Sequence, residues 1–273
     1  MESFDGKVAV ITGAGSGIGR ALAIDLARRG SRLALSDVNT AAVAETAALC
    51  EKEGAQAQHS VLDVADRAAV YAHAAAVAAE FGQVNLVFNN AGVALTADIA
   101  DMSWDDFEWI VGINFWGVMY GTKAFLPHLI ESGDGHLVNI SSVFGLFAVP
   151  SQSAYNASKF AVRGFTEALR QEMKLAGHPV GVSCVHPGGI KTNIAKNARA
   201  AEGLDADRLA ALFDKIARTT PEAAAKRILR GVHRNEAKVL VGPDAYALDL
   251  MPRVLGSGYQ RLVGAAAKRG LKQ

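Results

Sequence analysis

The sequence has little cysteine, with only Cys50 and Cys184 among its 273 residues. The two lie far apart in apolar segments, which is typical of buried thiols in a reducing compartment, with a disulfide between them as the alternative. Two cysteines are too few for a disulfide framework or for a zinc site built from cysteines. We therefore expect neither a disulfide-stapled fold nor a bound metal.

The sequence also lacks an excess of charge, because 28 Lys and Arg residues stand against 27 Asp and Glu residues, for a net charge of +1. A protein that neutralises nucleic-acid phosphates needs a basic excess, so no nucleic-acid partner is expected. Half of the residues are hydrophobic and a fifth are charged, a composition that excludes a disordered chain.

Long uninterrupted apolar runs are absent as well. Residues 1–5 contain no basic start followed by an apolar stretch, so no secretory signal is expected. The uncharged windows 83–97 and 135–158 are interrupted by Asn, Ser, Gln and Gly, which makes them poor membrane spans. The sequence accordingly favours a cytoplasmic protein.

Short β-branched runs alternate with alanine-rich stretches of helical length along most of the chain. This alternation predicts βαβ units and an α/β fold: a doubly wound, parallel seven-stranded sheet with helices on both faces. The expected strands are 7–12, 31–36, 55–62, 84–89, 135–141, 179–185 and 238–241. The expected helices are 17–29, 40–52, 66–81, 154–175 and 221–234, with one or two more within 104–129.

Two segments interrupt the alternation. Residues 187–220 lie between a strand and a helix and are too long for an ordinary loop, which indicates a lid over a binding site. Residues 243–273 follow the last strand as a tail. We therefore expect a single domain over residues 1–242, which includes the lid, and a separate C-terminal tail.

The densest glycine cluster is Thr12-Gly13-Ala14-Gly15-Ser16-Gly17-Ile18-Gly19, between the first predicted strand and the first predicted helix. Backbone N–H groups at a helix N-terminus attract phosphate, and missing β-carbons allow it to come close. The glycine spacing is G-x-x-x-G-x-G and not G-x-G-x-x-G. We interpret the cluster, from Gly13 to Gly19, as the site of a dinucleotide pyrophosphate, with a flexible turn as the alternative.

Asp37 ends the second predicted strand, where a carboxylate accepts hydrogen bonds from an adenosine ribose and repels a 2′-phosphate. NAD is therefore favoured over NADP, and a helix-capping role for Asp37 is the alternative. Asp63 and Val64 close the third predicted strand at the same edge of the sheet. Asp63 is there either an adenine ligand or a capping carboxylate.

Tyr155 and Lys159 are four residues apart on a predicted helix, so their side chains share one face. A phenol with a pKa near 10 is a poor proton donor or acceptor at pH 7. An ammonium about 5 Å away favours the phenolate by on the order of 3 kcal/mol at an effective dielectric of about 20. Such a pair alone is common on helices, but here Ser142 precedes Tyr155 by thirteen residues and Asn89-Asn90-Ala91-Gly92 ends another strand.

The sequence resembles the short-chain dehydrogenase/reductase family, in its single-domain NAD(P)-dependent branch. The motifs that carry the resemblance, in the order in which they occur, are T-G-x-x-x-G-x-G, N-N-A-G, the serine, Y-x-x-x-K and the later P-G. The resemblance covers residues 5–242. It implies a Rossmann-like sheet with the active site at the carboxyl ends of its strands, and an oxidoreductase that acts on CH–OH groups.

The resemblance also implies a role for individual residues. Tyr155 is the expected general acid/base, and Ser142 rather than its neighbour Ser141 is expected to hold and polarise the substrate oxygen. Lys159 is expected to lower the pKa of Tyr155 and to bind the nicotinamide ribose, and Asn114 to hold a water that links the lysine to solvent. Further cofactor contacts are implied for Asn90, Ala91, Gly92, Pro187, Gly188, Ile190 and Thr192.

Residues 143–150, between the serine and the tyrosine, carry no charge and are predicted to form a wall of the substrate pocket. The pocket residues expected are Phe144, Phe147, Val149 and, from the lid, Ile194, with core packing as the alternative for each. An apolar wall favours a lipophilic or bulky secondary alcohol or its ketone. The alternatives are an NADPH-dependent 3-oxoacyl reductase, which Asp37 disfavours, and a non-catalytic NAD(P)-binding regulatory protein.

The tail has no acidic residue beyond Asp249. Its basic residues there are Arg253, Arg261, Lys268, Arg269 and Lys272. We interpret it as amphipathic, with an apolar face that packs on its own domain or on a neighbouring subunit, and with an anionic membrane surface as the alternative. The family resemblance implies a homodimer or homotetramer that associates through the helices of residues 114–129 and 155–175.

Overall fold

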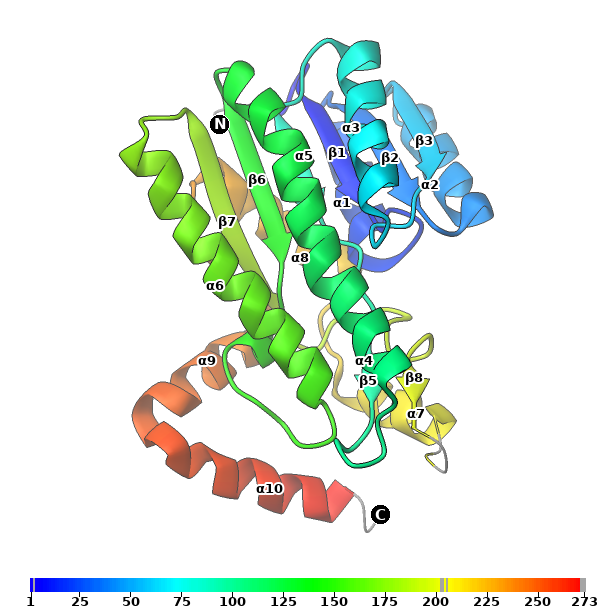
Figure 1. Cartoon of the computed structure of the whole chain (residues 1–273). Coiled ribbons are helices and arrows are strands. Elements are labelled where there is room, and N and C mark those ends of the chain that lie inside the picture. Colours follow the sequence, from blue (N-terminus) through cyan, green and yellow to red (C-terminus); the bar gives the residue numbers. More distant parts are fainter. Residues whose placement is uncertain (2, 202–203, 205, 271–273) are drawn as a thin grey trace.

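The computed structural model describes residues 1, 3–201, 204 and 206–270. Within them, seven strands form one sheet in the order β3-β2-β1-β4-β6-β7-β9, and every neighbouring pair is parallel. The strands are β1 (Val8–Thr12), β2 (Arg32–Asp37), β3 (Ala57–Val61), β4 (Leu86–Asn89), β6 (Gly135–Ile140), β7 (Val180–Pro187) and β9 (Lys238–Val241). The predicted doubly wound, seven-stranded parallel sheet is confirmed (Figure 1).

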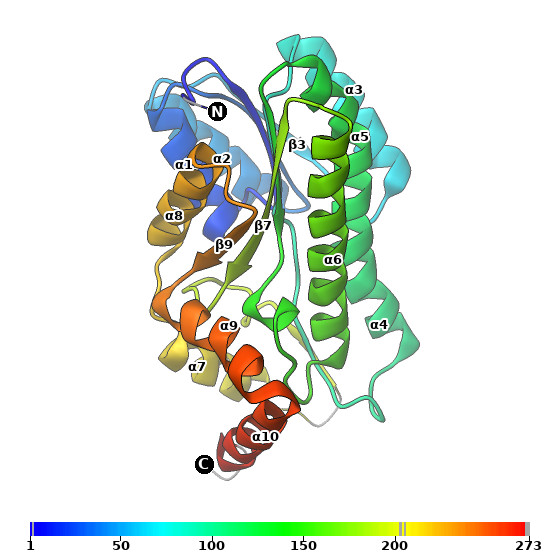
Figure 2. The same ribbon diagram turned by 90° about the vertical axis from the view of Figure 1, so that its left-hand side faces the viewer.

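Helices cover both faces of the sheet, as Figure 2 shows from the side. One face carries α1 (Gly17–Arg28), α2 (Thr40–Lys52) and α8 (Pro221–His233), and the other carries α3 (Arg67–Phe81), α5 (Gly117–Glu131) and α6 (Ser153–Leu175). Successive residues of β1 enter opposite cores, because side chains alternate along a strand. Ala9 and Ile11 pack in the first core, and Val8 and Val10 pack in the second.

Local capping explains where several helices begin. The side chains of Asn39, Asp66 and Thr220 accept hydrogen bonds from backbone N–H groups three residues later, at the starts of α2, α3 and α8. Pro221 occupies the first turn of α8, where its missing N–H group has no helical partner to lose. These caps satisfy N–H groups that the first turn of each helix would otherwise leave without a partner.

The region expected to hold one or two helices within 104–129 is α4 (Trp104–Val111) followed by α5, with a π-helical turn over Gly112–Trp116 between them. The residue pattern does not predict this turn, because its hydrogen bonds, one residue wider than those of an α-helix, leave no distinct hydrophobic period. The expected helix is therefore continuous but locally widened.

The segment 187–220 contains a short strand and a helix rather than a plain loop. β8 (Arg199–Ala200) pairs in parallel with β5 (Leu95–Thr96), and α7 (Ala206–Ile216) follows. Strands of two residues are too short to show the alternation by which a sequence predicts strands. Residues 202, 203 and 205 of this segment lie outside the described part of the chain.

The tail consists of two helices, α9 (Pro243–Leu255) and α10 (Tyr259–Gly270), separated by a 3₁₀ turn over Gly256–Gly258. Tyr259 and Val263 pack against the domain, whereas Leu262 is 58% exposed. Lys272 lies outside the described residues. No helix in the described part of the chain is long and apolar enough to cross a membrane.

Candidate active site

The glycine loop joins β1 to α1 at the carboxyl edge of the sheet, next to the point between β1 and β4 where the strand order reverses. At two positions of this loop, other backbone atoms come so close that only glycine fits. A β-carbon on Gly13 would lie 2.8 Å from the Cα atom of Ala91, and one on Gly19 would collide with the carbonyl oxygen of Gly13. Ser16 is the N-cap residue of α1 but makes no side-chain cap, so the helix N-terminus keeps N–H groups for a ligand.

Asp37 lies beside this loop at the end of β2. Its Oδ2 accepts a hydrogen bond from the N–H of Gly15 at 2.9 Å, and its Oδ1 accepts one from the N–H of Asn39 at 2.9 Å. Asn39, and not Asp37, caps α2 through its own side chain. The carboxylate is therefore fixed against the glycine loop, at the position predicted for the ribose contact.

Asp63 and Val64 follow β3 at the same edge. Asp63 accepts a hydrogen bond from the N–H of Ala65 at 2.9 Å and is exposed, whereas Val64 is buried. Asp66 provides the cap of α3, so the alternative in which Asp63 caps that helix is wrong. Its carboxylate instead supports the turn between β3 and α3.

The loop after β4 is tied to the glycine loop by Thr12, a residue to which the motifs assign no role. The Thr12 hydroxyl accepts hydrogen bonds from the N–H groups of Asn90 and Ala91, at 3.0 and 3.1 Å. The Asn90 amide donates to the carbonyl oxygens of Thr12 and Gly13, at 2.9 and 3.1 Å. This network fixes the two loops against each other.

Ser142, Tyr155 and Lys159 meet where β6 ends and α6 begins, and all three are buried. The Ser142 hydroxyl accepts a hydrogen bond from the N–H of Phe144, whereas the Ser141 hydroxyl donates to the carbonyl oxygen of Lys159 at 2.8 Å. The Lys159 ammonium donates to the carbonyl oxygen of Ile140 at 3.1 Å and lies 5.6 Å from the centre of the Tyr155 ring. Ser142 shares a side-chain hydrogen bond with Tyr155, whereas Ser141 is engaged with the helix backbone.

Burial changes the acid–base properties of this group. It raises the pKa of Tyr155 above its ordinary value, and a hydrogen bond with Ser142 acts in the opposite direction. Burial also lowers the pKa of Lys159 to about 8, against a smaller opposite effect of Cys184. In the chain alone, burial thus outweighs the hydrogen bond with Ser142, and the pKa of Tyr155 is raised rather than lowered as expected.

Asn114 lies in the π-helical turn and is fully buried. Its side chain accepts a hydrogen bond from the N–H of Val93 at 2.8 Å and donates to the Val93 carbonyl at 2.9 Å. A β-carbon on Gly92 would lie 3.2 Å from the Asn114 Oδ1 atom and 3.4 Å from the Lys159 Nζ atom, so Gly92 allows the two side chains to converge. A π-helical turn within a helix is frequent at functional sites.

The loop after β7 reaches the glycine loop from the other side. Ile190 is buried, and the side chain of Thr192 lies 3.1 Å from where a β-carbon of Gly17 would be. The N–H of Gly188 donates to the carbonyl oxygen of Val241 at 2.9 Å, which holds the segment after Pro187 to β9. The two loops predicted to hold the two ends of the cofactor are therefore adjacent at Gly17 and Thr192.

The predicted substrate wall is only partly open. Phe144 is half-buried and meets the Tyr155 ring edge-on, with 6.1 Å between the centroids. Phe147 is 3% exposed and packs with the tail, as does Val149, so both belong to a small core behind the wall. Ile194 lies half-buried in the turn after Thr192.

One residue outside the motifs contacts the catalytic candidates directly. The Nδ1 atom of His186 lies 2.9 Å from the carbonyl oxygen of Ser142, and the ring is fully buried. Burial lowers its pKa to about 4, so the ring is neutral and donates through Nδ1. The two residues are far apart in sequence, and only the neighbouring positions of β6 and β7 bring them together.

The motifs and this geometry agree with the comparison with known proteins. A family model described as short chain dehydrogenase matches residues 7–203. The chain belongs to the short-chain dehydrogenase/reductase family. As a member of that family, it is an oxidoreductase that depends on a nicotinamide cofactor, and the glycine cradle described above fits such a dinucleotide.

Individual relatives of this short-chain dehydrogenase cover nearly its whole length. The Mycobacterium tuberculosis protein named "Putative oxidoreductase SadH" is 58% identical over 270 residues, which is 98% of each chain. Estradiol 17-beta-dehydrogenase 11 of Mus musculus is 34% identical over 255 residues, covering 93% of this chain and 81% of that one. A crystal structure of a Burkholderia phymatum short-chain dehydrogenase/reductase in complex with NAD is 35% identical with a TM-score of 0.88, covering 93% of this chain and 95% of that one.

Proposed function

We propose that the protein interconverts a lipophilic or bulky secondary alcohol and its ketone with NAD as cofactor, and that Tyr155 is the general acid/base. The buried group of Ser142, Tyr155 and Lys159 supports this proposal most directly, because it lies beside the glycine loop with an aromatic wall against the tyrosine. The bound nicotinamide supplies or accepts the hydride.

The side chains have separate tasks in this proposal. Ser142 donates its hydroxyl hydrogen to the substrate oxygen. The Tyr155 hydroxyl gives a proton to that oxygen in reduction, and the Tyr155 phenolate takes a proton from it in oxidation. The positive charge of Lys159 favours the phenolate form of Tyr155. Burial of all three excludes water, which strengthens each of these interactions.

The apolar surroundings support the substrate class. Residues 143–150 carry no charge, and the ring of Phe144 stands edge-on to Tyr155. A sugar or a carboxylate substrate would need polar partners that this wall does not offer. The name of the mouse relative refers to estradiol, which is itself a lipophilic secondary alcohol.

A panel of secondary alcohols, tested with NAD and with NADP, examines this function. We expect NADH formation with hydrophobic secondary alcohols and little with polyols or hydroxy acids. Turnover only with NADPH and 3-oxoacyl thioesters would support a 3-oxoacyl reductase instead. Tight cofactor binding without turnover on any substrate would support a regulatory binding protein.

Asp37 is proposed to select NAD. Replacing it with Ala removes the acceptor for the ribose hydroxyls and the charge that repels a 2′-phosphate. Because a hydrogen bond to a charged group contributes about 1.5–3 kcal/mol, the Kd of NADH should rise roughly 10- to 100-fold while that of NADPH falls. Fluorescence titration measures both constants. Asp66→Asn, which removes a carboxylate but keeps a good helix cap, is the matched control and should change neither.

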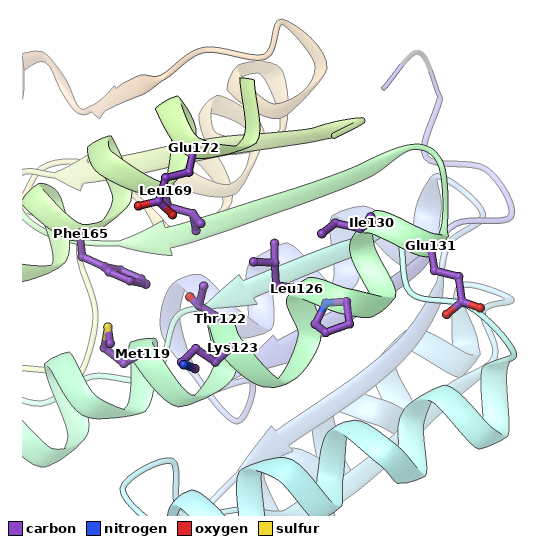
Figure 3. A pocket seen from close by; sticks show the side chains of 10 residues that line it. Met119, Thr122, Lys123, Leu126, Ile130, Glu131, Phe165, Leu169 and Glu172 are labelled. Atoms are coloured by element: carbon purple, nitrogen blue, oxygen red, sulfur yellow. The ribbon is translucent and has the colours of Figure 1, made fainter. Parts of the chain in front are cut away.

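We further propose that the protein is a homo-oligomer that associates through α5 and α6. A groove of 680 Å³ runs between these helices (Figure 3), lined mainly by apolar side chains, among them Met119, Leu126, Ile130 and Phe165. An arginine in place of Leu126 would bury a charge in such an interface, so light scattering should show a smaller particle for Leu126→Arg than for the wild type. Ile99→Arg, in the turn after β5 and 71% exposed, is the control. A wild-type particle with the mass of one chain would contradict the proposal.

A further inference from the structure

The C-terminal helices α9 and α10 lie at the end of the sheet where β7 finishes, beside the start of α6 (Figures 1 and 2). They lie outside residues 7–203, which the family model matches. Nevertheless they contact two loops of the candidate active site, one on the cofactor side and one on the substrate side. The function proposed above gives the tail no role.

Asp244 makes the first contact, from the first turn of α9. Its Oδ2 accepts a hydrogen bond from the N–H of Gly189 at 2.7 Å. A β-carbon on Gly188 would collide with the same carboxyl group, so the loop backbone lies directly against it. The loop held in this way continues into Ile190 and Thr192, the residues expected at the nicotinamide.

Tyr259 makes the second contact, from the first residue of α10. Its hydroxyl accepts a hydrogen bond from the N–H of Ala148 at 3.1 Å, and its ring meets Phe147 edge-on with 6.1 Å between the centroids. Phe147 in turn meets Phe144 edge-on at 5.5 Å, and Phe144 meets Tyr155 edge-on at 6.1 Å. Four aromatic rings thus connect the tail to the proposed acid/base in consecutive contacts.

The packing around these rings makes the tail and the loop a common core. Val143, Phe147 and Ala245 are buried together, and the half-buried residues around them come from both sides. Those residues are Phe144, Val149, Leu240, Leu248, Met251, Tyr259 and Val263. Because protein cores are close-packed, a change at Tyr259 reaches Phe144 through Phe147.

We propose that Asp244 and Tyr259 are positioning residues that fix the two sides of the active site separately. Asp244 holds the loop of residues 187–192 against the cofactor, and Tyr259 holds the loop of residues 143–149 against the substrate. This division rests on the proposed function, which assigns one loop to each ligand. Loss of the Asp244 contact should therefore weaken binding of the cofactor, and loss of the Tyr259 contact should weaken binding of the substrate.

The test compares Asp244→Ala and Tyr259→Ala in the full-length protein. Loss of one hydrogen-bonded contact corresponds to about a tenfold change in binding. Asp244→Ala should raise the Kd of NADH about tenfold, and Tyr259→Ala should raise the KM of the ketone by a similar factor without changing the Kd of NADH. Asp244→Asn and Tyr259→Phe should restore much of the loss, since an acceptor oxygen or the aromatic ring remains. Leu262→Ala, on the exposed side of α10, is the control and should change neither constant.

Hydrogen–deuterium exchange tests the same proposal without any substrate. Exchange in residues 143–149 should accelerate in Tyr259→Ala alone, and exchange in residues 187–192 should accelerate in Asp244→Ala alone. If the wild type turns over no alcohol or ketone, the proposed function fails while these exchange rates still decide the positioning roles. Equal acceleration of both loops in both variants, or of neither, would overturn the inference.

Discussion

Replacement of Tyr155 by Phe is expected to lower turnover by about 10²- to 10⁴-fold, the usual contribution of a general acid/base. The change removes only the hydroxyl group. The ring keeps its edge-on contact with Phe144 and its place 5.6 Å from the Lys159 ammonium, so the buried packing of the site is preserved. The Kd of NADH and the melting temperature should therefore stay near their wild-type values.

Steady-state kinetics with the best alcohol of the panel measures this loss, and fluorescence titration of NADH shows that the site remains formed. Tyr71→Phe removes a hydroxyl from an exposed position of α3 and should leave turnover unchanged. A Tyr155→Phe enzyme that keeps more than about a tenth of wild-type turnover would not be consistent with the assignment, because an acid/base contributes at least about 10²-fold.

The sheet was predictable from the sequence because its determinants are local. The buried strands β1, β4 and β6 are short, mainly apolar runs in the sequence. The helices α2 and α3 begin after capping residues that the sequence also shows. Parallel strands joined by helices then leave few topologies, since crossover connections have a fixed hand. The same argument fails for β5 and β8, whose pairing joins residues about a hundred positions apart through two residues on each strand.

The candidate site divides in the same way. The glycine loop and the Tyr155–Lys159 pair are recognisable because each lies within one turn or one helix, where spacing determines geometry. The contacts of His186 with Ser142 and of Asp244 with Gly189 join separate segments, and no spacing rule predicts them. The burial of Phe147 also depends on where the tail folds back, so its place behind the substrate wall appears only in the structure.

Replacement of Lys159 by Met is expected to cause the second large loss. The Lys159 ammonium lies 5.6 Å from the centre of the Tyr155 ring. An ammonium about 5 Å from a phenolate oxygen stabilises it by on the order of 3 kcal/mol at an effective dielectric of about 20, which corresponds to about 100-fold in rate. Methionine fills similar space without the charge. Lys52→Met, at the exposed end of α2, is the matched control and should have wild-type activity.

The pH dependence separates the effect of the charge from that of shape. Burial lowers the pKa of Lys159 to about 8, so the side chain is charged below that pH and becomes neutral as the pH rises above it. The ratio of wild-type to Lys159→Met activity should therefore be constant up to about pH 8 and then fall by up to about tenfold per pH unit, as the charged fraction does. A ratio that stays constant from pH 6 to pH 10 would contradict a role for the charge.

The burial of Lys159 also predicts that the Lys159→Met variant is no less stable than the wild type. The pKa of Lys159 is lower in the folded chain, about 8, than its ordinary value of 10.5, so the unfolded chain binds the proton more tightly. The charge therefore costs the folded state about 3 kcal/mol at pH values below 8, and this cost disappears as the pH rises towards 10.5. At pH 7, Lys159→Met should melt at or above the wild-type temperature, and the difference should shrink at pH 10. If Lys159→Met loses most of its activity but none of its stability, the lysine is not needed to hold the fold together. Its charge, which destabilises the folded chain, then contributes to the reaction through its effect on Tyr155.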